Sequence, residues 1–105
     1  MLGIEVSITR FVSDEPQPGI VECEFIDVNG YEWKFLEKTA VVSEADLNSD
    51  TNYPQPGVIG CQVIEKKADI LLVTTTEPWN IESTTGETEF RVYLDSLVEC
   101  ENGAD

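Results

Sequence analysis

The chain has 105 residues, which gives room for one domain with its own core and little room for a second. It has 21 acidic residues, six basic residues and no histidine, so its formal net charge is −15. This charge opposes binding to nucleic acid and to anionic membranes, which both require lysine and arginine. The absence of histidine excludes Ser-His and Cys-His catalytic pairs and removes the commonest zinc ligand.

The acidity has two explanations that the sequence leaves open. It attracts a cationic partner such as a basic protein, or it only keeps a small protein in solution. The acids are spread along the chain, with local groups at Asp14-Glu15 and from Glu44 to Asp50.

No targeting or membrane segment is evident in the sequence. Residues 1–10 lack the basic stretch and the unbroken apolar core of a signal peptide. No apolar run approaches membrane-spanning length. We therefore expect a cytoplasmic protein without membrane attachment, either a monomer or a weak homodimer.

Residues 2–12 alternate between apolar and polar positions, with Leu2, Ile4, Val6 and Ile8 on one face. This pattern predicts a half-buried strand.

A longer motif then occurs twice, as PQPGIVECEFI at 16–26 and PQPGVIGCQVI at 54–64. Proline fixes φ and glycine allows a sharp change of direction, so each copy predicts a corner that starts a strand.

Each corner is followed by the pattern of a β-hairpin. In the first hairpin, strands at 20–28 and 31–35 flank Asn29-Gly30, which predicts a type I′ turn with positive φ at both residues. Lys34 is expected to pair with Glu22 or Glu24 across it. In the second, strands at 58–65 and 70–76 flank a turn at 66–69.

The remaining segments are less regular. Residues 43–47 form either one helical turn with Ser43 as N-cap or part of a loop. A last strand is expected at 87–94, and 95–98 either continue it or close as a short turn. The sum is an all-β protein of about six strands, one domain over 1–105. We expect a small closed or partly open barrel, or a tight two-layer sandwich, because open edges promote aggregation.

The three cysteines are odd in number and form no CxxC motif, so a disulfide framework is not indicated. Cys23 and Cys61 occupy equivalent places in the repeat. They are either small buried apolar residues or a bridged pair. Cys100 lies in a polar tail.

One stretch resembles a calcium loop, because oxygen-bearing side chains stand at every second position in Asp46, Asn48, Asp50 and Asn52. It departs from the EF-hand at position six, which is Thr51, and at position twelve, which is Gly57. The alternative is a loop stabilised by Asx-turns. Beyond a weak calcium site, we expect no cofactor.

Trp79 differs from the other large aromatics. Trp33 and Phe35 fall at inward strand positions and are expected in the core. Trp79 follows a proline in a polar loop. It either folds back as a lid whose N–H meets a carbonyl, or it contacts a partner.

The Asn29-Gly30 hairpin, the YPQPG segment at 53–57 and the EPWNIEST segment at 77–84 together resemble a group of small bacterial proteins with no assigned function. That resemblance implies no catalytic residues. In size and charge alone, the chain is also similar to immunity proteins, which neutralise a partner toxin.

We therefore expect a non-enzymatic protein-binding module, an immunity or inhibitor protein in its most concrete form, that engages a basic partner. The expected contact residues are Asp14, Glu15, Glu44, Asp46, Asp50 and Trp79. The alternatives are a small-ligand binder or hydrolase with paired carboxylates in a barrel mouth, and a calcium-binding structural domain.

Overall fold

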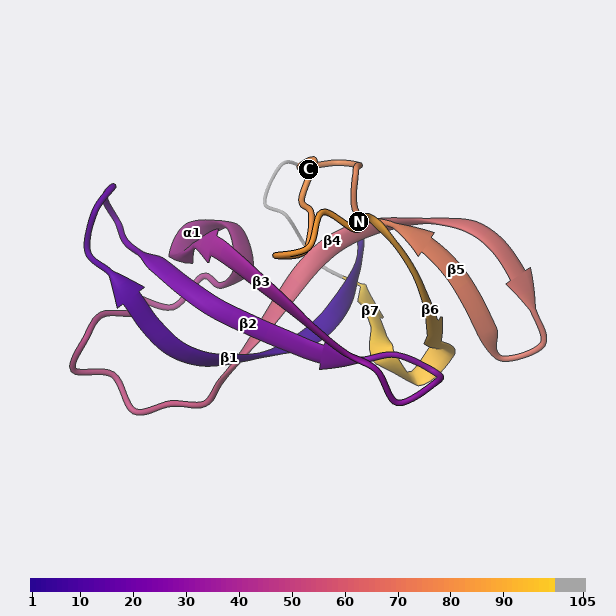
Figure 1. Ribbon diagram of the computed structural model, residues 1–105, viewed down its shortest axis with the longest axis horizontal. Coiled ribbons are helices and arrows are strands. Elements are labelled where there is room, and N and C mark those ends of the chain that lie inside the picture. Colours follow the sequence, from indigo (N-terminus) through magenta and orange to yellow (C-terminus); the bar gives the residue numbers. More distant parts are fainter. Residues whose placement is uncertain (100–105) are drawn as a thin grey trace.

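The computed structural model describes residues 1–99 and shows one strongly curled antiparallel sheet in the form of a half-barrel (Figure 1). This confirms the all-β, barrel-like fold predicted above. Its strands are β1 Leu2–Ser13, β2 Ile20–Ile26, β3 Glu32–Lys38, β4 Gln55–Lys67, β5 Ile70–Thr74, β6 Glu89–Tyr93 and β7 Leu97–Glu99. A short helix, α1 Thr39–Val42, follows β3, and a 3-10 turn, η1 Leu94–Ser96, joins β6 to β7.

Strand β1 is the centre of the sheet, whose order is β3-β2-β1-β4-β5-β6. Its residues 2–8 pair with β4 along one edge. Its other edge pairs with β7 at residues 2–4 and with β2 at residues 7–13. Because β6 leads through η1 into β7, the chain returns to β1 after the sheet has curled round. The predicted alternation is confirmed, since Ile4, Val6 and Ile8 are buried.

The core lies on the concave side of the sheet and contains an aromatic cluster. Phe90 packs edge-on against Phe25, with ring centroids 5.3 Å apart, and against Phe35 at 5.7 Å. Trp33 approaches the same ring at 5.1 Å. Such pairs add about 0.5–1.5 kcal/mol beyond the burial of their area. The cluster therefore ties β6, at one side of the sheet, to the β2–β3 hairpin at the other.

The first hairpin is confirmed, but the predicted turn type is wrong. Only Gly30 has positive φ (+82°), whereas a type I′ turn requires it at Asn29 as well. The carboxylate of Asp27 accepts hydrogen bonds from the N–H groups of Asn29 and Tyr31 and from the indole N–H of Trp33. A turn that closes around Asp27, with Gly30 as its single left-handed residue, satisfies all three donors.

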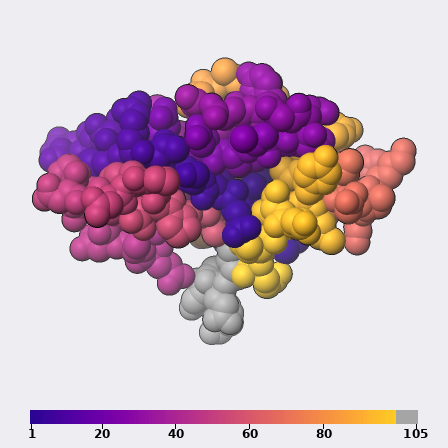
Figure 2. Space-filling model, turned by 90° about the horizontal axis from the view of Figure 1, so that it is seen from below, coloured from indigo at the N-terminus to yellow at the C-terminus, as the bar shows by residue number. Residues whose placement is uncertain are grey.

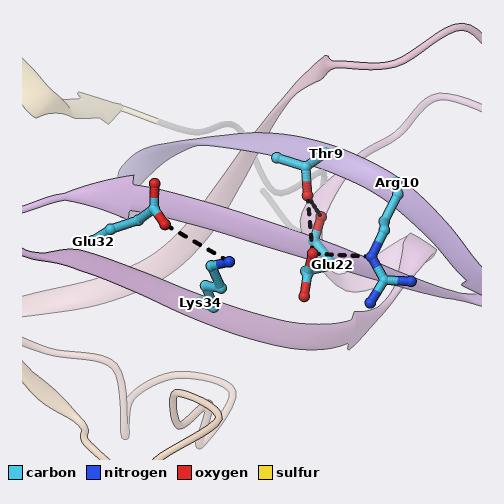
Figure 3. A network of polar contacts seen from close by, with 5 residues as sticks. All are labelled: Thr9, Arg10, Glu22, Glu32 and Lys34. Atoms are coloured by element: carbon cyan, nitrogen blue, oxygen red, sulfur yellow. Dashed lines mark hydrogen bonds and ion pairs between the residues drawn. The ribbon is translucent and has the colours of Figure 1, made fainter.

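The ion pairs of this region also differ from expectation (Figure 3). Lys34 stands opposite Glu24 in the register of β2 and β3. Its Nζ atom nevertheless lies 3.7 Å from Glu32 on its own strand, and within residues 1–99 no ion pair joins it to Glu22 or Glu24. Glu22 instead accepts a 3.0 Å hydrogen bond from Nε of Arg10 on β1. That bond, assisted by the charge of Arg10 and opposed by partial burial, lowers the pKa of Glu22. The prediction missed Arg10 because it considered the hairpin without its neighbour β1.

For residues 43–47, the loop alternative is confirmed and the helical turn with Ser43 as N-cap is wrong. The short helix is α1, Thr39–Val42, and Ser43 follows it as C-cap. Ser43 Oγ accepts a hydrogen bond from the N–H of Ala45, so this residue organises a loop.

Cys23 and Cys61 are both buried, and no disulfide joins them. Cys23 pairs with Ile8, and Cys61 pairs with Leu2 on the opposite edge of β1, so one strand and six residues separate them. Burial, together with the charges of Glu37 and Glu22, raises the pKa of Cys23 to about 12, which makes this thiol unreactive. Cys100 lies outside the described residues.

Candidate functional site

One candidate site is a groove of about 500 Å³ that contains Trp79, here called the Trp79 groove. Helix α1, the middle of β4, the loop that follows β5, and β7 surround it. Its apolar surface is provided by Val41, Val58, Val98 and Trp79. Glu44 and Glu99 lie at its rim, where the amino-terminal ammonium of Met1 is 3.5 Å from Oε1 of Glu99.

Trp79 forms a wall of this groove because the loop before β6 is held firmly and because β4 has no side chain at Gly60. A Cβ atom at Gly60 would lie 3.0 Å from Cδ1 of the indole. The N–H groups of Asn80 and Ile81 donate to the carbonyl oxygens of Thr76 and Thr75, which fixes the loop to the two residues that follow β5. The indole therefore rests on the β4 backbone.

The outer face of Trp79 remains in solvent, since the side chain is 53% exposed. The lid interpretation requires a hydrogen bond from the indole N–H to a carbonyl oxygen. Within residues 1–99, the indole N–H of Trp79 makes no such bond. A large aromatic group that keeps half its surface and its N–H donor available is suited to contact with a partner.

The structure brings together only part of the predicted contact set. Glu44 and Trp79 line the same groove. Asp14 and Glu15 belong to the turn between β1 and β2, and Asp46 and Asp50 to the loop between α1 and β4. These two segments lie at one end of the molecule, opposite the tip of the β4–β5 hairpin (Figures 1 and 2). All four acids are exposed there.

Sequence reasoning missed Gly60, Val98 and Glu99. A signal existed for Gly60, because an isolated glycine inside a strand pattern often marks a close approach of another segment. Val98 and Glu99 had no such signal. They reach the groove only because η1 turns the chain back so that β7 pairs with β1.

The loop that resembles a calcium site makes the hydrogen bonds of an Asx-turn. Oδ1 of Asn48 accepts a 2.8 Å hydrogen bond from the N–H of Asp50, and the hydroxyl of Tyr53 donates to the carbonyl oxygen of Asn48. In the part of the chain that the structure describes, no three Cys, Asp or Glu side chains lie close enough to share a metal ion. Calcium binding by Asp46, Asn48, Asp50 and Asn52 stays a prediction.

Glu37 is the acid that comes nearest to the interior. It lies on the inward side of β3, two residues after Phe35, and burial raises its pKa. No aspartate or glutamate among residues 1–99 is fully buried, so the described structure shows no enclosed pair of carboxylates.

No family model, no curated protein and no solved structure matches this chain. Within residues 1–99, no helix is of a length and hydropathy that would cross a bilayer.

Proposed function

We propose that the protein is a non-enzymatic protein-binding module whose partner presents lysine or arginine beside apolar side chains. One observation supports this most: a half-exposed tryptophan forms the wall of an apolar groove that has Glu44 at its rim. Tryptophan is among the residues that most often dominate interface energetics. An immunity or inhibitor protein is the most concrete form of this function.

The acidic end of the molecule would act before contact is made. Asp14, Glu15, Asp46 and Asp50 are exposed and project a negative field in a chain of net charge −15. Such a field accelerates the encounter with a cationic protein and contributes less to the lifetime of the complex. The two parts thus have separable kinetic roles, with the acids setting the association rate and the groove setting the dissociation rate.

The experiment begins by capturing partners from the protein's own cell lysate at low salt and purifying a captured protein. Association and dissociation rates are then measured against salt for the wild type, for W79A and for the quadruple variant D14N/E15Q/D46N/D50N. Tyr93→Ala is a matched control, because it removes an exposed aromatic side chain outside the groove.

We expect W79A to raise the dissociation rate about tenfold or more, and the quadruple variant to lower mainly the association rate. Tyr93→Ala should change neither. An association rate that is flat across salt would refute the electrostatic part of the proposal, and W79A behaving like Tyr93→Ala would refute the groove.

A further inference from the structure

The chain's basic residues are unevenly placed. Of six lysines and arginines, Lys66 and Lys67 end β4 and Arg91 lies on β6; Lys67 and Arg91 line one hollow. Arg10 and Lys34 form ion pairs with neighbouring glutamates. Within residues 1–99, Lys67 and Arg91 have no acid at salt-bridge distance, although the chain has 21 acids.

These two cations line a hollow of about 600 Å³, here called the basic hollow. Its lining includes Val28, Glu65, Lys67, Ile70, Leu72 and Arg91. A volume of this size is typical of pockets that take small molecules.

Strand register explains why charge and apolar surface alternate in this hollow. Leu72 stands between Glu65 on β4 and Arg91 on β6, and Ile70 stands opposite Lys67. Directly opposed residues share one face of a sheet, and this face is the outer one, because the intervening Leu71 is buried in the core. Two aliphatic side chains therefore lie between two cationic ones.

The wall of the hollow is fixed by the tip of the first hairpin. The N–H of Val28 donates a 3.0 Å hydrogen bond to the carbonyl oxygen of Arg91. Figure 1 shows the β2–β3 turn beside β6, where this bond forms. Val28 thereby adds a third aliphatic surface from a distant part of the chain.

We propose that the basic hollow binds a small amphipathic monocarboxylate. The planar guanidinium of Arg91 suits a carboxylate, Lys67 adds a second cation, and Ile70 and Leu72 accept the hydrocarbon part. With Glu65 present, the hollow has one net positive charge, and the rest of the chain repels multiply charged anions. A single negative charge on an apolar body is the ligand that these features favour.

Octanoate is a suitable probe, titrated while amide NMR correlation spectra are recorded. We expect shifts concentrated at the residues of the hollow, and affinity about tenfold weaker in R91Q, because a charge-assisted hydrogen bond is lost. Lys38→Gln is the matched control: Lys38 is also exposed, and the described residues offer it no ion pair. This control should bind octanoate like the wild type.

R91Q keeps the main-chain oxygen that accepts the hydrogen bond from Val28, and the Arg91 side chain is exposed, so the fold should persist. Unchanged dispersion of the amide spectrum verifies that R91Q is folded. Equal shifts with octanol would overturn the role of charge. Equal shifts with acetate or inorganic phosphate would overturn the role of the apolar surface. Absence of saturable shifts, or R91Q binding as well as Lys38→Gln, would overturn the site. W79A should bind octanoate normally, so this test is independent of the function proposed for the Trp79 groove.

Discussion

The two Pro-Gln-Pro-Gly segments have the same four residues and adopt different structures. The first forms a tight turn between β1 and β2, in which the N–H of Gly19 donates a 2.9 Å hydrogen bond to the carbonyl oxygen of Pro16. The second lies largely within β4, where Gln55, Pro56 and Gly57 pair with Ile8, Ser7 and Val6 of β1, so the corner predicted at this copy is wrong. Only Gly19 has a left-handed φ, +129°.

This difference shows that the surroundings, and not the tetrapeptide, determine the local structure. The first copy follows β1 directly and must reverse the chain so that β2 can pair with β1. The second copy lies along the opposite edge of β1. There its backbone pairs with residues 6–8 of β1, so it forms the start of a strand. The two glycines are consequently required for different reasons, conformation at Gly19 and space at Gly57.

Replacing each glycine by alanine tests this distinction and should give the largest effects. At Gly19, a Cβ would meet the Phe11 ring at 2.7 Å in a backbone conformation that L-residues avoid, so Gly19→Ala should cost about 2–4 kcal/mol. At Gly57, φ is ordinary, but a Cβ would lie 2.8 Å from Cδ1 of Ile8, so Gly57→Ala should cost about 1–3 kcal/mol. Chemical denaturation measures both losses.

A second substitution then separates the two causes. Ile8→Val removes Cδ1 and should recover part of the loss in Gly57→Ala, whereas Phe11→Leu should recover little in Gly19→Ala, because the strained φ persists. Equal recovery at both positions would show that crowding alone explains both glycines.

The hairpins that follow the two segments differ in how their turns are held, and Asp27 is the main cause. Asp27→Ala should destabilise the protein by about 2 kcal/mol, because two backbone N–H groups and the Trp33 indole lose a charged acceptor. Burial tends to raise the pKa of Asp27, but these three hydrogen bonds outweigh it, and the pKa is lowered.

Because the folded-state pKa lies below that of the unfolded chain, the stabilisation by ionised Asp27 is complete above the unfolded value. It is lost as the pH falls through the folded value. The difference in unfolding free energy between the wild type and Asp27→Ala should therefore be constant near neutrality and shrink in strong acid. A difference that grows on acidification would contradict this account.

The second hairpin has no comparable acceptor and instead places Ala68 at φ +58°, in a two-residue turn between Lys67 and Ile70. An alanine in the left-handed conformation destabilises the folded protein by about 1–2 kcal/mol. Glycine avoids this strain, but it offsets part of the gain because it has more conformational entropy in the unfolded chain. Ala68→Gly should therefore stabilise the protein by up to about 1 kcal/mol, measured as a rise in melting temperature. Gly30→Ala, with φ +82° in the first hairpin, should act in the opposite direction.

Much of the fold was predictable because the alternation of apolar residues is local information. Strand β1, both hairpins and the inward positions of Val21, Cys23 and Phe25 followed from period-two patterns and from Asn29-Gly30. The turn type was not predictable from the dipeptide, because Asp27 competes for the same backbone donors. The position of α1 was missed because its sequence, TAVV, contains no capping signal.

The candidate site was less predictable than the fold. Exposure of Trp79 could be inferred from its polar loop, but its proximity to Glu44 depends on how β4 and the β5–β6 loop meet. The basic hollow gave no signal at all, since Lys67 and Arg91 are 24 positions apart and become neighbours only through Ile70 and Leu72 of β5.

The central position of β1 has a consequence for how the molecule can unfold. The β2–β3 hairpin and the β4–β5 hairpin both pair with β1. Without residues 2–13, neither hairpin has a complete set of neighbouring strands. The two hairpins therefore form one cooperative body and not a pair of autonomous ones. Loss of β1 would release both hairpins and β7 together, and unfolding should therefore be a single all-or-none event.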